Sequence, residues 1–188
     1  MKGRLPVLDL PTDRPRQAIQ SDRGARFLFS VSGDVTDRLR ALSRKQGATL
    51  FMTLAAAFQV LLMRYSGLED FCLGTPVANR PKRETELLIG FFANTLVLRA
   101  DLAGNPTFID LLARVQETVL GAQAHQDLPF EQLVDALQPV RALSHTPLFQ
   151  VMFALQPSLA KTMAVTSLDV RAMELDAGGA KFDLSLDM

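Results

Sequence analysis

The sequence predicts an α/β fold in which helices pack against a mixed sheet, and two observations point to it. Segments with apolar residues at helical spacing alternate along the chain with short, nearly unbroken apolar runs that are typical of buried strands. The chain has 188 residues, is 48% hydrophobic and 21% charged, and can therefore bury a substantial core without a disulfide or a metal. We expect one layered domain.

The N-terminal segment differs from the rest of the chain. Residues 1–23 contain three prolines and many charges, and proline forbids helix and favours extended neighbours. We therefore predict an extended strap over 1–23, followed by the layered part of the chain over 24–188. At the start of this part, residues 26–32 (RFLFSVS) are expected to form a short strand.

Four helices are predicted, each from apolar residues at helical spacing together with a residue suited to its start or end. They cover 33–47, ended by Gly47; 50–65, capped by Thr49; 104–126, capped by Asn105; and 129–137, entered through Pro129. The second has apolar residues on nearly all its faces, which indicates a buried helix.

Strands are predicted where apolar runs lie between turn residues or charged loops. They cover 71–78, 89–102, 147–155, 165–175 and 181–188. The second is almost unbroken in apolar residues, as expected of a strand covered on both faces. The last reaches Met188 with no turn after it, which we interpret as a sign that the chain is a fragment.

Charge and cysteine content argue against several kinds of site. The net charge is zero; residues 1–45 carry ten basic and five acidic side chains, a density typical of a solvated surface and not of a nucleic-acid site. Cys72 is the single cysteine, so neither a disulfide nor a metal site is expected. No apolar signal sequence is present and the apolar run 50–63 is too short to cross a bilayer, so we predict a cytoplasmic protein without a membrane partner.

Three polar residues interrupt or end the predicted strand over 89–102. Asn94 and Thr95 lie in its middle on opposite faces, and Arg99 lies toward its end. A buried amide without partners costs roughly 1–3 kcal/mol, so Asn94 either bonds to nearby backbone or faces a cavity that holds a ligand. Arg99 is either an exposed charge at the strand end or part of a channel wall.

The segment HQDLPFEQLVDAL raises the question of a catalytic pair, because His125 lies two residues before Asp127. A local interpretation is preferred. Asp127 and Glu131 suit the entry of the following helix, where carboxylates accept backbone N–H groups, and His125 suits the end of the preceding one. Side chains two residues apart around a turn need not converge, and no serine or cysteine nucleophile is marked out.

Three motif segments resemble the condensation domain of nonribosomal peptide synthetases. They are IGFFANTLVLR (89–99), HQDLPFEQLV (125–134) and RALSHTPLFQVMF (141–153). The first resembles the family's I-G-x-F-V-N-T-x-x-x-R strand with Ala93 in place of valine, the second matches H-Q-D-x-P-F-E, and the third has Ala142 in place of an acidic residue. The resemblance covers essentially the whole chain.

The resemblance implies a chloramphenicol acetyltransferase-like fold of two lobes. This chain would hold the C-terminal lobe, truncated at its end, and strap 1–23 would come from the inter-lobe region. The implied reaction joins a donor aminoacyl or peptidyl thioester to an acceptor aminoacyl thioester through an amide bond. Both would ride on phosphopantetheine arms of peptidyl carrier proteins, with no cofactor bound directly. The other partners would be the missing N-terminal lobe and an adjacent adenylation domain.

The resemblance also implies roles for particular residues. Candidates for the wall of the substrate tunnel are Asn94, Thr95, Arg99 and, more weakly, Arg80. The structural motif residues would be His125, Gln126, Asp127, Pro129, Phe130 and Glu131. The family's catalytic H-H-x-x-x-D-G motif is absent from this sequence, which has no adjacent pair of histidines. We therefore expect no catalytic residue here, no metal, and an isolated chain without activity.

Two alternatives stay open. The chain could be a non-catalytic module that docks a carrier protein or a neighbouring domain, with its basic N-terminal part meeting an acidic carrier helix. It could also belong to a related epimerisation or heterocyclisation domain, which shares the fold. The full matches to HQDLPFE and to Asn94-Thr95 favour condensation. An exposed half-domain should in addition show an apolar surface where the other lobe packs.

Overall fold

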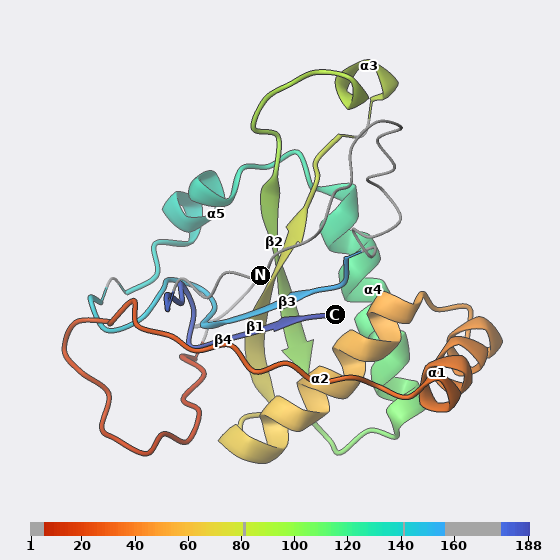
Figure 1. The fold of residues 1–188 in the computed structure, drawn as a ribbon, viewed down its shortest axis with the longest axis horizontal. Coiled ribbons are helices and arrows are strands. Elements are labelled where there is room, and N and C mark those ends of the chain that lie inside the picture. The colour runs from red at the N-terminus through yellow and green to blue at the C-terminus, as the bar shows by residue number, and fades with distance from the viewer. Residues whose placement is uncertain (1–5, 81, 141, 157–177) are drawn as a thin grey trace, which may run out of the picture.

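The computed structural model describes residues 6–80, 82–140, 142–156 and 178–188 (Figure 1). The helices are α1 (Gly33–Lys45), α2 (Leu50–Ser66), α3 (Arg83–Glu86), α4 (Phe108–Ala124) and α5 (Phe130–Leu137). The strands are β1 (Asp70–Val77), β2 (Asn94–Asp101), β3 (Val151–Ala154) and β4 (Leu184–Asp187). The α/β prediction is confirmed, and the strand predicted over 165–175 lies outside the described residues.

The strands form one mixed sheet in the order β2-β1-β3-β4. β1 and β2 are antiparallel, with Asp70 opposite Asp101 and Val77 opposite Asn94. β3 runs parallel to both β1 and β4. Figure 1 shows the long β1–β2 pair reaching toward α3, with α2 and α4 on one side of the sheet and α5 on the other. β2 is therefore an edge strand with helices on both sides.

Two clusters of buried side chains lie on opposite faces of this sheet, because successive strand residues alternate between faces. The main core takes Phe71 and Leu73 from β1 and packs them against α2 and α4. The smaller cluster takes Cys72 from β1 and Val97 from β2, and it contacts the apolar face of α5.

The helix predictions are largely confirmed, and their end signals explain why. α1 is followed by Gly47 at φ +62°, and the Thr49 hydroxyl accepts the Met52 N–H at 3.2 Å at the start of α2. The predicted cap of α4 is wrong. Thr107, not Asn105, caps that helix, since the Thr107 hydroxyl accepts the Asp110 N–H at 3.3 Å.

The strand predicted over 26–32 is wrong. The segment has no strand pairing with any described strand, and Phe27 and Leu28 are 86% and 60% exposed. Aromatic and apolar residues suit a strand, but a strand also needs neighbours for its backbone groups. The strand predicted over 89–102 likewise begins only at Asn94, where pairing with β1 begins.

The described part of the strap is extended and packs on the lobe. Leu8 is fully buried in the main core, and its N–H donates to the side-chain oxygen of buried Gln150 at 2.7 Å. Arg16 forms a two-bond ion pair with Asp183 and donates to the Ser144 carbonyl at 3.1 Å. This segment therefore contributes to the main core, while its origin between two lobes stays a prediction.

Candidate functional site

The Asn94 side chain joins two of the motif segments. It is the first residue of β2, and its amide nitrogen donates to the carbonyls of Gln126 and Leu128, each at 2.8 Å. Its amide oxygen accepts the N–H of Phe130 at 3.1 Å and that of Thr95 at 2.8 Å. Of the two possibilities that the sequence left open, bonding to nearby backbone is the one observed.

The start of α5 shows why the prediction for Asp127 is wrong. Pro129 precedes the helix and supplies no side-chain cap. Among the described residues, the side chain that accepts the N–H of Phe130 is Asn94 rather than Asp127. Glu131 lies in the first turn, where the helix dipole favours a negative charge. The entry of α5 is thus stabilised from another strand, 36 residues earlier in the chain.

His125 ends α4 and does not form a pair with Asp127. It is the residue after the last helical position, and its ring nitrogen Nδ1 lies 2.9 Å from the Gly121 carbonyl, to which it donates. Both His125 and Asp127 are exposed, and no ion pair links them within the described part of the chain. The local interpretation of this histidine is the one the geometry supports.

Phe130 anchors the same motif in the smaller cluster. Its ring meets that of Phe149 edge to face, with centroids 5.6 Å apart. Phe149 comes from the third motif segment and packs over Gly74 of β1, where an added Cβ would lie 2.3 Å from the ring. The three motif segments therefore meet near the start of β2, through the hydrogen bonds of Asn94 and the contact between these two rings.

Arg99 pairs with Asp70 on the neighbouring strand. Its Nε and Nη2 donate to the two carboxylate oxygens at 2.7 and 2.6 Å. These hydrogen bonds hold the pKa of Asp70 below its ordinary value and raise that of Arg99. Opposite Arg99 in the register of β1 and β2 lies Cys72, whose thiol pKa burial raises to about 12, so that it stays protonated and unreactive at neutral pH.

Arg80 organises the loop between β1 and β2. Its guanidinium donates to the carbonyls of Thr85, Leu88 (2.9 Å) and Gly90 (3.3 Å) and lies 4.1 Å from the centre of the Phe92 ring. This satisfies carbonyls at and beyond the end of α3. Arg80 thus has a structural role in the described residues that its motif did not reveal.

The four tunnel candidates do not converge. Asn94 lies at one end of β2, Arg99 lies toward the other and is bonded to Asp70, and Arg80 is enclosed by its own loop. Thr95 points to the face opposite Asn94, and its hydroxyl makes no hydrogen bond within the described residues. Whether any of them lines a tunnel stays a prediction.

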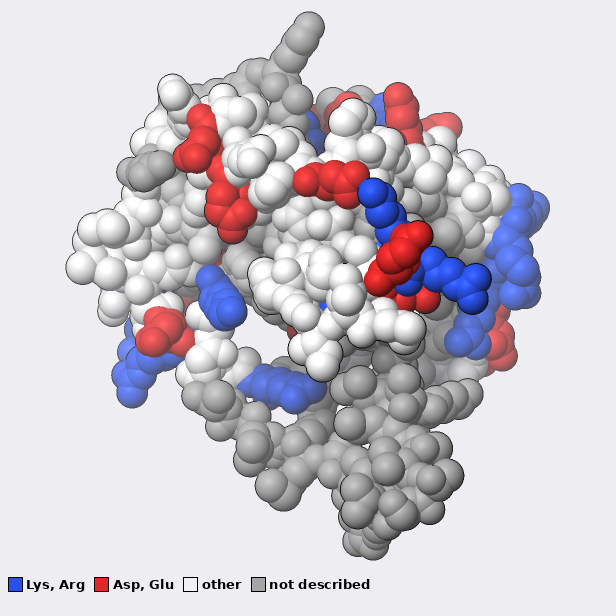
Figure 2. All heavy atoms as spheres, turned by 90° about the horizontal axis from the view of Figure 1, so that it is seen from above, with Lys and Arg blue, Asp and Glu red and all other residues white. Residues whose placement is uncertain are grey.

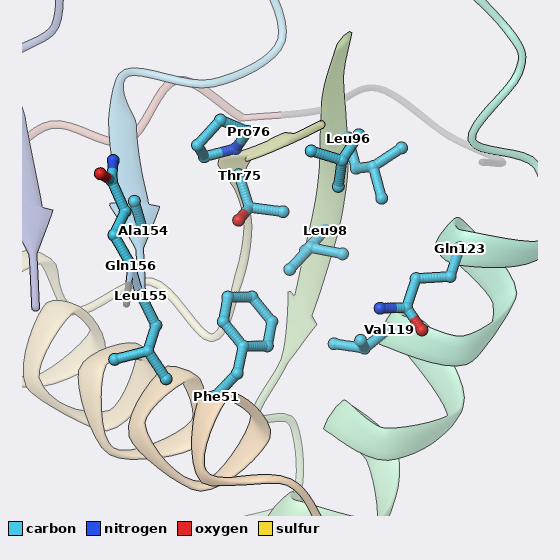
Figure 3. Close-up of a pocket in the computed structure, with 11 residues that line it drawn as sticks. Phe51, Thr75, Pro76, Leu96, Leu98, Val119, Gln123, Ala154, Leu155 and Gln156 are labelled. Carbon is cyan, nitrogen blue, oxygen red and sulfur yellow. The ribbon is translucent and has the colours of Figure 1, made fainter. Parts of the chain in front are cut away.

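A cavity of about 170 Å³ lies elsewhere, where the ends of β1 and β3 approach α2 and α4 (Figure 3). In Figure 3, Thr75 stands above Phe51, with Leu155 on one side and Leu98 on the other. Thr75 is 5% exposed, and its hydroxyl has no hydrogen-bond partner within the described part of the chain. Sequence reasoning missed this position, because a threonine in a buried strand gives no signal of a cavity.

The charged surface is mixed on the face that Figure 2 shows. Figure 2 shows acidic and basic side chains side by side over uncharged surface, without a large area of one sign. Among the described residues, no group of three or more His, Cys, Asp or Glu side chains could hold a metal. No single described helix is long and apolar enough to cross a membrane, although α1 and α2, bent by 107°, reach the required length and composition together.

Comparison with known proteins identifies the class to which this chain belongs. A family model for the condensation domain matches residues 1–188. The chain belongs to the condensation-domain family.

Its relatives are large peptide synthetases. The chain is 55% identical over 190 residues to a linear gramicidin synthase of Brevibacillus parabrevis and 49% identical over 188 residues to malpinin synthetase of Mortierella alpina. All of this chain is covered in both cases, but only 4% and 2% of those proteins. The chain thus corresponds to a small part of each relative.

Solved structures agree with the fold. The X-domain from teicoplanin biosynthesis is 34% identical with a TM-score of 0.74, over 79% of this chain and 33% of that chain. Holo-AB3403, a four-domain nonribosomal peptide synthetase, is 26% identical with a TM-score of 0.86, over 95% of this chain and 15% of that chain. The described fold therefore recurs within larger proteins of this class.

Proposed function

We propose that this chain is the C-terminal lobe of a condensation domain that forms an amide bond between two carrier-bound substrates. The observation that carries the proposal is the match of the condensation-domain family to residues 1–188. The relatives support it, since they are peptide synthetases such as the phosphinothricin tripeptide synthetase PhsC of Streptomyces viridochromogenes, 47% identical over 187 residues.

The proposed reaction depends mainly on the orientation of its two substrates, because forming an amide from an activated thioester is already favourable. Holding two reactants in line can contribute about 7–11 kcal/mol. The attacking amine must be neutral, and a free α-amino group with a pKa of about 8 is mostly protonated at pH 7. A histidine that accepts its proton typically contributes about 10²–10⁴-fold. That histidine would come from the H-H-x-x-x-D-G motif of the other lobe.

Part of the tunnel wall would come from this chain. The candidates are Asn94, Thr95, Arg99 and Arg80. Thr95 is the best suited of them to contact substrate, because its hydroxyl is half-buried and uses no hydrogen bond within the described residues. Arg99 and Arg80 would shape the wall through the bonds they make to Asp70 and to the β1–β2 loop.

The other lobe would cover the apolar surface of the β1–β2 loop. Leu87, Ile89 and Phe91 occupy alternate positions of this loop, and each is at least 94% exposed. Several large apolar side chains exposed so close together in the chain are typical of an interaction site. Peptidyl carrier proteins, whose phosphopantetheine arms would deliver the substrates, and an adenylation domain would be further partners. A cytoplasmic location stays a prediction.

A docking module is the second candidate function, and the surface of α1 favours it. Arg38, Arg40, Arg44 and Lys45 are all exposed on this helix, beside Asp34 and Asp37. Such a surface could attract an acidic helix of a carrier protein, with an association rate that falls as salt rises. Docking and catalysis are compatible in the intact domain, but only docking could survive in the isolated chain.

The two candidates are separated by one experiment. The isolated chain and the intact domain that contains it are incubated with loaded donor and acceptor carrier proteins, and the dipeptide is measured by mass spectrometry. We expect product from the intact domain and none above the uncatalysed rate from the isolated chain. Product from the isolated chain at enzyme-like rates would show that the H-H-x-x-x-D-G motif is dispensable. No product from the intact domain, together with salt-sensitive carrier binding by the chain, would favour docking.

A further inference from the structure

The chain between α4 and α5 has to pass around an edge strand. α4 packs on the main core and α5 on the smaller cluster, which lie on opposite faces of the sheet. β2 is the outermost strand on that side, so residues 125–129 cross from one face to the other beside its first residue. That first residue is Asn94, and Figure 1 shows the connection passing from α4 to α5 near the start of β2.

The Asn94 amide holds the crossing segment through both its nitrogen and its oxygen. A primary amide can donate two hydrogen bonds and accept two. Its two donated bonds go to Gln126 and Leu128, and its two accepted bonds come from Phe130 and Thr95. Turning the amide over would set its oxygen against two carbonyl oxygens. The orientation is therefore fixed, and no hydrogen-bonding capacity is left for a substrate.

We propose that Asn94 is a positioning residue, which seats the segment from Gln126 to Phe130 and the start of α5 on β2 and acts on the reaction only through that segment. This inference rests on the proposed function for its effect on turnover, but not for the seating itself. It refines the tunnel prediction for Asn94. A side chain whose four hydrogen bonds all go to protein atoms supports the residues of the wall and does not contact the substrate itself.

The cap that α5 lacks locally makes this role specific. Pro129 cannot cap the helix through its side chain, and Asn94 accepts the N–H of Phe130 in its place. The Phe130 ring then lies against Phe149 in the smaller cluster. Loss of the amide should therefore displace the loop and the first turn of α5 together, while α2 and α4 on the other face stay in place.

The seating is tested on the 188-residue chain with Asn94→Ala, and with Asn94→Ser as a milder variant that keeps one oxygen. We expect the melting temperature to fall by about 3–10 °C for Asn94→Ala. We also expect faster hydrogen exchange at Phe130 and NMR shift changes concentrated in residues 126–130. Asn105→Gly is the matched control, because Asn105 is exposed at φ +48° and glycine adopts that backbone freely. Unchanged exchange at Phe130 would overturn the proposal.

The effect on the reaction is tested in the intact domain at a temperature where every variant is folded. We expect Asn94→Ala to lower turnover by about tenfold or more, because small displacements near a reaction site are costly. Unchanged turnover with a displaced segment would mean that Asn94 only stabilises. Lost turnover with unshifted residues 126–130 would mean that it contacts substrate. Either result overturns the proposal. Absence of amide product from the unmodified domain would instead overturn the proposed function, and hydrogen exchange alone would then decide the seating.

Discussion

The two faces of the sheet are held in different ways. On the face of α2 and α4, carbon packs against carbon: Phe153 lies 5.2 and 5.7 Å from the rings of Phe51 and Phe58, and Leu8 fills the core from the strap. On the face of α5, the cluster is smaller, and beside it, at the edge of the sheet, the Asn94 side chain bonds to the segment that leads into α5. The first face holds most of the buried core, and the second receives the rings of Phe130 and Phe149 from two of the motif segments.

The largest expected effect comes from the face of α2 and α4. Leu8→Ala should lower the free energy of unfolding by about 2–5 kcal/mol, because it empties a fully buried position. The measurement is urea unfolding followed by circular dichroism. Val7→Ala is the matched control, since Val7 is 40% exposed, and it should change stability by no more than about 0.5 kcal/mol. If Leu8→Ala and Val7→Ala change the free energy of unfolding by the same small amount, the strap is not part of the core in solution.

An intermediate effect is expected where Gly74 meets Phe149 beneath the motif segments. Gly74→Ala should lower the free energy of unfolding by about 1–3 kcal/mol, because the new Cβ would lie 2.3 Å from the Phe149 ring and that ring must move. Adding Phe149→Leu should make the combined cost smaller than the sum of the two single changes. Gly121→Ala, in α4 with open space at its Cβ, should be neutral or stabilising. If the free-energy changes of the two substitutions simply add, the contact between Gly74 and the Phe149 ring is contradicted.

The smallest effect is expected at the ion pair of Arg99 and Asp70. The pKa of Asp70 is lowered in the folded chain, so the pair contributes stability above the unfolded carboxyl pKa of about 3.9 and loses it as pH falls through the lower folded value. Both side chains are partly exposed, at 30% and 40%, so screening limits the contribution to about 0.5–1 kcal/mol. Asp70→Asn should reduce stability at about pH 6, and the difference from the unmodified chain should vanish as the pH falls below the lowered folded pKa of Asp70. A difference that is independent of pH would rule out the ion pair as its source.

Local patterns were sufficient to predict four of the five described helices, while the short α3 was not predicted. The helix predicted over 50–65 is observed as α2, because its cap, apolar content and terminating glycine all lie within or beside its own sequence. The strand predicted over 26–32 failed because a strand depends on neighbours that its own residues do not specify. Likewise, Asp127 was a reasonable local cap for α5, but a group from β2 occupies that place.

The candidate site was only partly predictable for the same reason. The sequence marked Asn94 as a polar residue in an apolar run and correctly offered backbone bonding as one of two outcomes. It could not say which backbone, since the partners on the crossing segment lie 32–36 residues away. The cation of Arg80 was marked as a tunnel candidate, while its bonds to three carbonyls of its own loop depend on how that loop folds back.

The loop that Arg80 holds has a consequence for association. Because one guanidinium fixes three carbonyls and stacks on Phe92, the exposed side chains of Leu87, Ile89 and Phe91 extend from a backbone that is already ordered. Covering such a tip costs less conformational entropy than covering a loop that must first take shape. A lysine could not substitute, since it lacks the planar fork that reaches several acceptors at once. Arginine at this position therefore preorganises an apolar surface before any other part of the protein contacts it.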